Sequence, residues 1–223
     1  MRNIALILLG GSGKRLGSEK PKQFLCRKDI PIYIDAIRKY ERVEQITDIL
    51  LVVNSDYIDE VKSDLKKFNI SKVVDVIKGG KERFISSYLG LKYLATYFSK
   101  EDNVLIGDAV RPNTSEIIIL ANIFALTEEK AVLTAIPGNP QAERIDTAHY
   151  IFNMPYLAQT PQSFKLGYIY ELYEEYINND NFFPLDDINV VELKKDKYVL
   201  VEGDKNNYKI TNIDDFNRYM NEV

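Results

Sequence analysis

The sequence predicts an α/β fold: a Rossmann-like, mostly parallel twisted sheet that is flanked by helices and carries an extended arm. Two observations lead to this prediction. Short apolar runs alternate with amphipathic stretches along most of the 223 residues, which is the order of repeated β-α-β units. The first run, residues 4–9, is continuously apolar (IALILL), as expected of a parallel strand that is buried on both faces.

The other elements of the first half follow the same alternation. Apolar runs predict strands at residues 49–53, 73–77, 104–106 and 131–136. Helical spacing of apolar side chains predicts helices at residues 32–40, 57–68, 82–98 and 115–126. Because strand–helix–strand connections are right-handed crossovers between parallel strands, these elements predict one layered sheet.

The second half is less regular. Residues 137–159 contain three prolines and predict an excursion from the sheet, either a surface loop or an arm that contacts a partner subunit. The elements predicted after it are helices at 166–178 and 186–193, a strand at 198–202, and a closing helix at 213–220 with Asn212 as its N-cap. Without a repeat or linker, residues 1–223 are expected to form a single domain with a protruding arm at about 137–158.

Composition excludes several classes of protein. A single cysteine forms neither an intramolecular disulfide nor a cysteine-based zinc site, which favours a reducing compartment. His149 is the one histidine, so Ser-His-Asp or Cys-His catalysis would depend on it alone. The net charge of −4 argues against a broad nucleic-acid-binding surface. The first residues have neither the length of a membrane helix nor a signal-peptide cleavage region, so a cytoplasmic protein without a membrane partner is expected.

The strongest local signal is the glycine-rich turn (LGGSGKRLG) that follows the first predicted strand. Its closely spaced glycines let the backbone approach a ligand and direct N–H groups at phosphate oxygens. The turn is not a P-loop, because no Ser or Thr follows Lys14. It also differs from the dinucleotide-binding fingerprint, because Gly17 comes one residue too late after Gly13.

Cations concentrate around this turn. Between residues 14 and 28 the chain carries six Lys or Arg side chains and one acidic side chain, Glu19. In an acidic protein, such a concentration beside a glycine-rich turn predicts a polyphosphate ligand. A solvated charged loop is the alternative.

Five motifs follow one another along the chain. The glycine-rich turn is followed by PKQF at residues 21–24, GGKER at 79–83, DAVRP at 108–112, QTPQSF at 159–164 and NYKIT at 207–211. Together they resemble the cytidylyltransferases that act on polyol phosphates. That family includes the methylerythritol-phosphate enzyme of isoprenoid synthesis and the ribitol-phosphate enzyme of capsule and teichoic acid polymers. The resemblance implies a nucleotidyltransferase type A-like fold and a homodimer.

The resemblance also implies roles for individual residues. Arg15 and Lys22 would stabilise the pentavalent transition state, and Lys209 would contact the α-phosphate of CTP. Arg111 and Thr160 would contact the acceptor. The residues expected to bind the nucleotide are Leu9, Gly10, Gly11, Ser12, Gly13, Lys14, Gly79, Gly80, Lys81, Ser86 and Asp108, of which Gly79–Lys81 and Ser86 would read the cytosine.

The chemistry of nucleotidyl transfer suits these side chains. The acceptor phosphate is already an anion at neutral pH, so the reaction needs positioning and cations rather than a histidine base. Lys and Arg supply that charge. Asp108 ends a predicted strand, and its carboxylate is expected to be exposed and to bind Mg²⁺. Asp186 and Asp187 are interpreted either as a second acidic contact or as a helix cap.

Two departures from the family pattern concern the acceptor. The methylerythritol-phosphate enzymes carry a D-T pair after the fifth strand and an arginine eight residues before the TPQ threonine. Here Asn139-Pro140 and Phe152 occupy those positions. Ribitol or glycerol phosphate is therefore favoured as acceptor, giving a CDP-polyol and pyrophosphate.

Three other functions stay open at this point. The acceptor can be 2-C-methyl-D-erythritol 4-phosphate, or a sugar phosphate used with another nucleoside triphosphate. A regulatory nucleotide-binding protein without catalysis is the third, and the retention of Arg15, Lys22, Asp108 and Lys209 together argues against it.

Overall fold

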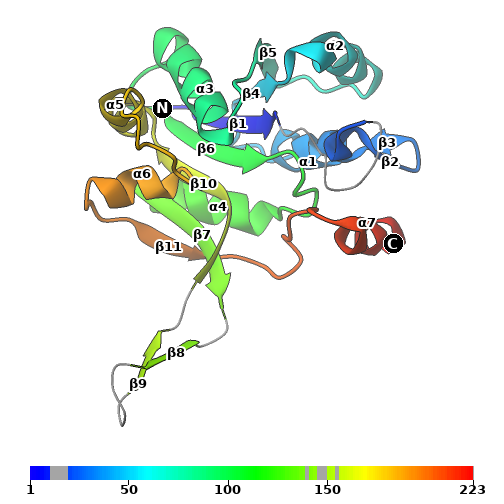
Figure 1. Cartoon of the computed structure of the whole chain (residues 1–223). Coiled ribbons are helices and arrows are strands. Elements are labelled where there is room, and N and C mark those ends of the chain that lie inside the picture. The colour runs from blue at the N-terminus through cyan, green and yellow to red at the C-terminus, as the bar shows by residue number, and fades with distance from the viewer. Residues whose placement is uncertain (11–19, 139–140, 145–149, 154–155, 223) are drawn as a thin grey trace.

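The structure, a computed structural model, describes residues 1–222 apart from 11–19, 139–140, 145–149 and 154–155, and for residues 141–144 and 150–153 it describes the backbone alone. Within the described residues a seven-stranded sheet forms the centre, in the order β11 (Val199–Glu202), β7 (Ala131–Pro137), β10 (Tyr156–Lys165), β6 (Asn103–Asp108), β1 (Asn3–Leu9), β4 (Asp48–Val53) and β5 (Val73–Lys78) (Figure 1). β10 runs antiparallel to β6 and β7, and the other pairs are parallel. The prediction of a mostly parallel sheet is confirmed.

Helices cover both faces of the sheet. Alternate residues of β1 point to opposite faces, as the period of two in a strand requires. Ile4, Leu6 and Leu8 pack with α3 (Arg83–Tyr97), α5 (Leu166–Tyr176) and α6 (Ile188–Leu193). Ala5, Ile7 and Leu9 pack with α1 (Ile32–Glu41), α2 (Ile58–Lys67) and α4 (Glu116–Ala125). The predicted helices and strands begin and end within two residues of those observed.

β10 is the strand of the central sheet that the sequence analysis missed. Residues 156–158, assigned there to the arm, are the beginning of this strand. The pairing of β10 with β7 shifts register between Ala158 and Gln162, so Pro161 lies at an irregularity where no regular ladder hydrogen bond is required of it. A polar segment that contains a proline (QTPQS) therefore gave no strand pattern, although it forms a strand inside the sheet.

The predicted arm leaves the sheet between β7 and β10. It contains a two-stranded antiparallel ladder of β8 (Gln141–Arg144) and β9 (Tyr150–Asn153), which extends away from the sheet (Figure 1). A second small ladder, β2 (Cys26–Arg27) with β3 (Ile30–Pro31), follows the short 3₁₀ helix η2 (Lys22–Phe24). Another 3₁₀ turn, η3 (Ser55–Tyr57), precedes α2.

The C-terminal helix α7 (Ile213–Asn221) anchors the segment that follows β11. Asn212 caps it as predicted, since its side chain accepts a hydrogen bond from the backbone of Asp215 in a capping box. Ile210 and Tyr219 pack with Ile32 and Val110 in a small buried cluster. Burial of such a side chain contributes roughly 1.5–3 kcal/mol. This packing fixes the chain directly after Lys209.

Candidate active site

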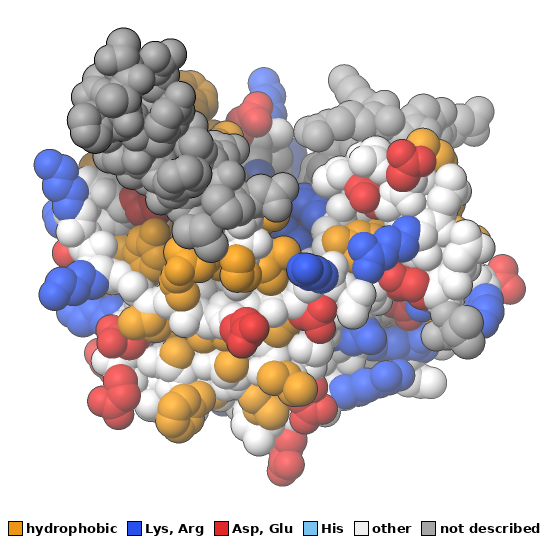
Figure 2. All heavy atoms as spheres, turned by 90° about the horizontal axis from the view of Figure 1, so that it is seen from below, with side chains coloured by type: hydrophobic (Ala, Val, Ile, Leu, Met, Phe, Trp, Pro, Cys, Tyr) orange, Lys and Arg blue, Asp and Glu red, His pale blue; other side chains and the backbone are white. Residues whose placement is uncertain are grey.

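The site lies at the C-terminal ends of β1 and β6. The chain passes from β1 to β4 and β5 on one side and then returns, so that β6 pairs with the other side of β1. Ligands of open α/β sheets bind at such a reversal of strand order. Leu9 ends β1 and Asp108 ends β6. Viewed from below, basic side chains gather in a recess near the centre of the molecule (Figure 2).

Ser86 joins the two predicted glycine loops. Its hydroxyl is buried, accepts a hydrogen bond from the backbone of Gly80 at 3.1 Å and donates one to the carbonyl of Glu82 at 3.2 Å. A Cβ on Gly79 would lie 2.9 Å from the Ser86 oxygen, and one on Gly10 would lie 3.3 Å from it. The structure thus brings Gly10, Gly79, Gly80 and Ser86 together, and the close approach explains why the loops carry glycine. Lys81 is exposed beside them.

Asp108 is the centre of the charged cluster. Among the described residues, three cations contact its carboxylate: Lys209 Nζ lies 2.9 Å and Arg111 Nε 3.6 Å from Oδ2, while Arg83 Nε lies 3.3 Å from Oδ1. Burial by itself would raise the pKa of Asp108, but the charges of Lys209, Arg83 and Arg111 outweigh it and hold that pKa well below its usual range. The three cations therefore favour the ionised form of Asp108.

The expectation of an exposed Asp108 carboxylate is wrong. The residue is 8% exposed, because Arg83 and Arg111 cover it from two sides. The donor chemistry still fits Mg²⁺, since an ionised carboxylate is a hard oxygen ligand. No group of three His, Cys, Asp or Glu side chains suited to a metal occurs in the described part of the chain. A magnesium ion held here would therefore take its other ligands from phosphate oxygens and water, as Mg²⁺ commonly does.

Asn207 holds the segment that carries Lys209. This fully buried side chain donates to the carbonyl of Thr160 at 2.9 Å and accepts from the hydroxyl of Thr114 at 3.0 Å. The backbone carbonyl of Asn207 accepts from Arg111 Nη1 at 2.6 Å. These contacts connect parts of the chain that are 47 to 96 residues apart. Lys209 follows two residues later, and its position is set by this anchoring.

Thr160 and Arg111 lie beside Asp108, as a shared site requires. The Thr160 hydroxyl accepts a hydrogen bond from the backbone of Asp108 at 3.2 Å. Both residues are largely buried. The guanidinium of Arg111 is held by the Asn207 carbonyl and by Asp108, so it is oriented before any ligand arrives.

Lys22 lies on η2, near the end of β1. The neighbouring Gln23 donates to the carbonyl of Leu9 at 2.8 Å, and Phe24 stacks on Tyr57 with ring centroids 4.3 Å apart. The charge of Lys22 also contributes to lowering the pKa of Asp215, after hydrogen bonds from the backbone and hydroxyl of Thr211. Gly11, Ser12, Gly13, Lys14 and Arg15 lie outside the described residues, as does His149.

Arg83 and Asp187 are the charged site residues to which sequence reasoning gave no firm role. Arg83 Nη1 lies 2.7 Å from Oδ2 of Asp187, and the Tyr173 hydroxyl donates to Oδ1 of Asp187 at 2.7 Å. Asp187 precedes α6, but its side chain caps no backbone N–H, so the cap interpretation is wrong for this residue. The local signal for Arg83 was its place at the end of the GGKER motif, in which the arginine was given no role.

Burial and charge act in opposite directions on the pKa of Arg83. Burial by itself would lower the pKa of Arg83, but the carboxylates of Asp187 and Asp108 outweigh it and raise that pKa. Burial raises the pKa of Tyr173, and the neighbouring Asp187 raises it further. Burial also raises the pKa of Asp186, which lies next to the pair in sequence.

The chain is similar to known proteins along nearly its whole length. A family model described as 2-C-methyl-D-erythritol 4-phosphate cytidylyltransferase matches residues 3–220. The chain is 35% identical over 221 residues to the 2-C-methyl-D-erythritol 4-phosphate cytidylyltransferase of Thermosipho melanesiensis, which covers 96% of this chain and 94% of that one. It is 30% identical over 222 residues to a ribitol-5-phosphate cytidylyltransferase of Streptococcus agalactiae, covering 97% and 92%.

A solved structure agrees with these matches. The crystal structure of a 4-diphosphocytidyl-2C-methyl-D-erythritol synthase from Anaerococcus prevotii superposes with a TM-score of 0.79 at 30% identity, covering 98% of this chain and 94% of that chain. No helix in the described part of this chain is long and apolar enough to cross a membrane. Because the family model spans nearly the whole sequence, the chain belongs to the 2-C-methyl-D-erythritol 4-phosphate cytidylyltransferase family and is a nucleotidyltransferase.

Proposed function

We propose that this protein transfers CMP from CTP to the phosphate of a short polyol phosphate, giving a CDP-polyol and pyrophosphate. The observation that carries the proposal is the convergence of Lys209, Arg111 and Arg83 on Asp108 at the end of β6. Oriented cations around a strand end are what a reaction between two phosphate groups needs. Relatives along the full length of the chain are named as cytidylyltransferases.

The proposed reaction is a displacement at phosphorus. An oxygen of the acceptor phosphate forms a bond to the α-phosphorus of CTP, and the bond to the β-phosphate oxygen breaks, so that pyrophosphate leaves with the electron pair. Arg111 binds the acceptor phosphate, and Lys209 neutralises charge at the α-phosphate. The Lys209 side chain is 36% exposed, so its ammonium can turn from Asp108 to an incoming phosphate oxygen. Lys22 and Arg15 neutralise further charge as pyrophosphate departs.

The proposal includes Mg²⁺. Asp108 would hold the ion, and when bound the ion would supply positive charge to the triphosphate. The protein's own contribution is to keep the Asp108 carboxylate ionised and fixed, through its contacts with Arg83 and Arg111.

Ribitol or glycerol phosphate is proposed as acceptor ahead of 2-C-methyl-D-erythritol 4-phosphate. Support comes from Asn139-Pro140 and Phe152, which stand where the methylerythritol-phosphate enzymes carry other residues. The second candidate is 2-C-methyl-D-erythritol 4-phosphate, which the 35% identity to the Thermosipho melanesiensis enzyme favours.

Pyrophosphate release tests both statements. The purified protein is incubated with CTP and Mg²⁺ and with each of ribitol 5-phosphate, glycerol 3-phosphate and 2-C-methyl-D-erythritol 4-phosphate. We expect the first two to be used faster. Much faster release with the third would reverse the order of acceptors, and no release with any of them would overturn the proposed function. Replacing CTP by UTP, GTP or ATP tests the choice of base.

The arm is proposed as the interface of a homodimer. Its β8–β9 ladder extends away from the sheet (Figure 1). Light scattering should report twice the chain mass of 25.7 kDa, and replacing residues 139–153 with a short Gly-Ser linker should give a monomer. A monomeric wild-type protein would contradict this.

A further inference from the structure

The guanidinium of Arg83 lies between two buried carboxylates. Its Nη1 is 2.7 Å from Oδ2 of Asp187, and its Nε is 3.3 Å from Oδ1 of Asp108. Asp187 is fully buried and Asp108 nearly so. Arg83 begins α3, Asp108 ends β6, and Asp187 precedes α6. One side chain thus connects three elements that are distant in sequence.

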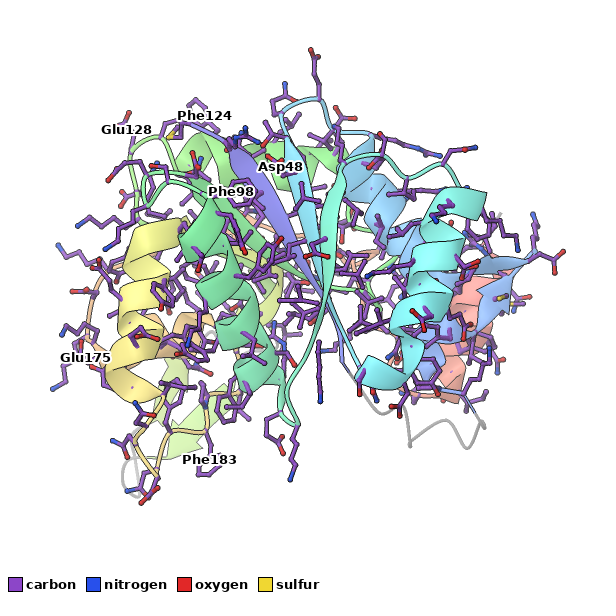
Figure 3. All side chains as sticks on the ribbon, turned by 90° about the horizontal axis from the view of Figure 1, so that it is seen from above. Asp48, Phe98, Phe124, Glu128, Glu175 and Phe183 are labelled. Atoms are coloured by element: carbon purple, nitrogen blue, oxygen red, sulfur yellow. The ribbon has the colours of Figure 1, made fainter. Side chains whose placement is uncertain are left out.

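Asp187, which lies at the end of this connection opposite Asp108, is also held in place. Oδ1 of Asp187 accepts a hydrogen bond from the hydroxyl of Tyr173 at 2.7 Å. Tyr173 lies on α5 and is fully buried. α3 and α5 pack side by side on the same face of the sheet (Figure 3). The series Tyr173, Asp187, Arg83 and Asp108 therefore runs from the packed helices to the edge of the candidate active site.

Fold stability does not account for this arrangement. Taking charges out of water costs free energy that their attraction does not always repay, so a buried ion pair is weak evidence for a stabilising role. In addition, Nη2 of Arg83 is buried and has no hydrogen-bond partner within the described residues. A purely structural cluster would avoid that cost.

The contact between Arg83 and Asp108 does explain the arrangement of these buried charges. Arg83 contacts Oδ1 of Asp108, while Lys209 contacts Oδ2 at 2.9 Å. Because the two cations use different oxygens, fixing Arg83 fixes the rotation of the carboxylate and hence which oxygen faces Lys209. Arg83 reaches Asp108 from the helix side, and Lys209 reaches it from the C-terminal segment.

We propose that Arg83 is a positioning residue for nucleotidyl transfer, held by the Asp187–Tyr173 pair so that it sets the orientation of the Asp108 carboxylate. This inference rests on the proposed function. It assigns Asp187 and Tyr173 to the reaction although neither would touch a substrate. The expected signature is a loss of turnover without a matching loss of nucleotide binding.

Two tyrosines on α5 provide a matched test. Tyr173→Phe removes the hydroxyl that holds Asp187. Tyr168→Phe removes a hydroxyl that donates to Asp196 at 3.0 Å on the surface, away from Asp108. Both variants lose one oxygen and keep the aromatic ring. Each is assayed for kcat and KM with CTP and the best acceptor, for CTP binding by calorimetry in EDTA, and for its midpoint of thermal unfolding.

Tyr173→Phe is expected to lower kcat by about 10-fold, in line with the usual effect of removing a group that orients a site carboxylate. Its CTP dissociation constant should stay within about threefold of wild type, and Tyr168→Phe should change kcat by less than about twofold. Asp187→Asn, which keeps the shape of the side chain, should lower kcat by roughly 10- to 100-fold. If Tyr173→Phe and Asp187→Asn both had the kcat of the wild-type protein, the inference would be overturned.

Arg83→Lys separates positioning from charge. Lysine keeps the positive charge but lacks the fork that contacts two carboxylates at once. We expect it to lose kcat as Asp187→Asn does, with CTP binding retained. A wild-type kcat in the Arg83→Lys variant would overturn the positioning role of Arg83. Failure of the wild-type protein to turn over any acceptor would instead be a failure of the proposed function, so the two failures are distinguishable.

Discussion

The ammonium group of Lys209 lies 2.9 Å from Oδ2 of Asp108, so the last residue of β6 holds a cation from the C-terminal segment at the mouth of the site. A phosphate that binds here must draw Lys209 away from a carboxylate. Because Arg83 and Arg111 also contact Asp108, the carboxylate stays compensated when Lys209 moves. This arrangement keeps Lys209 oriented in the free protein and leaves it available to a ligand.

Removing the Lys209 ammonium tests this relationship. Lys209→Ala should lower kcat by about 10²–10³-fold, the usual effect of removing one group that stabilises transition-state charge. Lys205→Ala is the matched control, since Lys205 is an exposed lysine four residues away on the same segment. Steady-state kinetics with CTP would check both variants. Comparable activity in Lys209→Ala and Lys205→Ala would exclude the role given to Lys209.

Chelation of divalent cations should stop turnover. EDTA removes the ion that Asp108 is proposed to bind, and added Mg²⁺ should restore pyrophosphate release. CTP binding to the glycine loops should persist in part, which calorimetry in EDTA can measure. Continued turnover without divalent metal would remove the metal-binding function proposed for Asp108.

Asn207 should affect both stability and activity. Asn207→Ala removes the side chain that donates to the Thr160 carbonyl, and leaving such a buried group unsatisfied costs about 1–3 kcal/mol. Turnover should also fall because the Lys209 segment loses its anchor. Asn206→Ala is the control, because the Asn206 side chain is exposed and contacts Arg218 on the surface. Urea unfolding and kinetics on both variants would check this, and equal behaviour would show that Asn207 is not the anchor.

Asp215 gives the stability of the protein a dependence on acid pH. Its carboxylate accepts hydrogen bonds from the hydroxyl and backbone of Thr211 and from the backbone of Asn212. Burial by itself would raise the pKa of Asp215, but these hydrogen bonds outweigh it and lower that pKa. The stabilisation is therefore fully present above the unfolded pKa of about 3.9 and is lost as the pH falls through the folded pKa.

The corresponding variant is Asp215→Asn. It should lower the free energy of unfolding by about 1 kcal/mol at pH 7, as for a lost helix cap. Its difference from wild type should shrink toward pH 3, because the carboxyl of the unfolded wild-type chain takes up a proton there more readily than the folded one does. Urea unfolding at pH 7, 5 and 3 measures the difference. A difference that stays constant over this range would contradict the assignment.

Local patterns were sufficient for most of the fold. The central-sheet strands of the first half are short and mostly apolar, and the helices carry apolar stripes, so their bounds follow from these patterns. β10 did not follow, because its middle (QTPQS) is polar and contains Pro161, and a register shift in the sheet accommodates this segment. No local sequence pattern indicates this register shift, because the shift depends on the pairing of β10 with β7.

The candidate site was also predicted only in part from local sequence patterns. Asp108, Arg111, Thr160 and Lys209 were predicted from motifs, and the structure brings them together. The burial of Asp108 was not predicted, because it depends on Arg83, 25 residues away in sequence. Asp187, paired with Arg83 across 104 residues, resembled a helix cap because an acidic residue before a helix ordinarily is one.

The anchoring of Asn207 has a consequence for how the enzyme is assembled. Its partners come from β10 and from the segment after β6, and it is followed by the residue that supplies the site's C-terminal cation. A chain whose sheet had formed but whose last twenty residues had not docked would present Asp108 without Lys209. With the role proposed for Lys209, catalytic activity would require the docked C-terminal segment as well as the sheet.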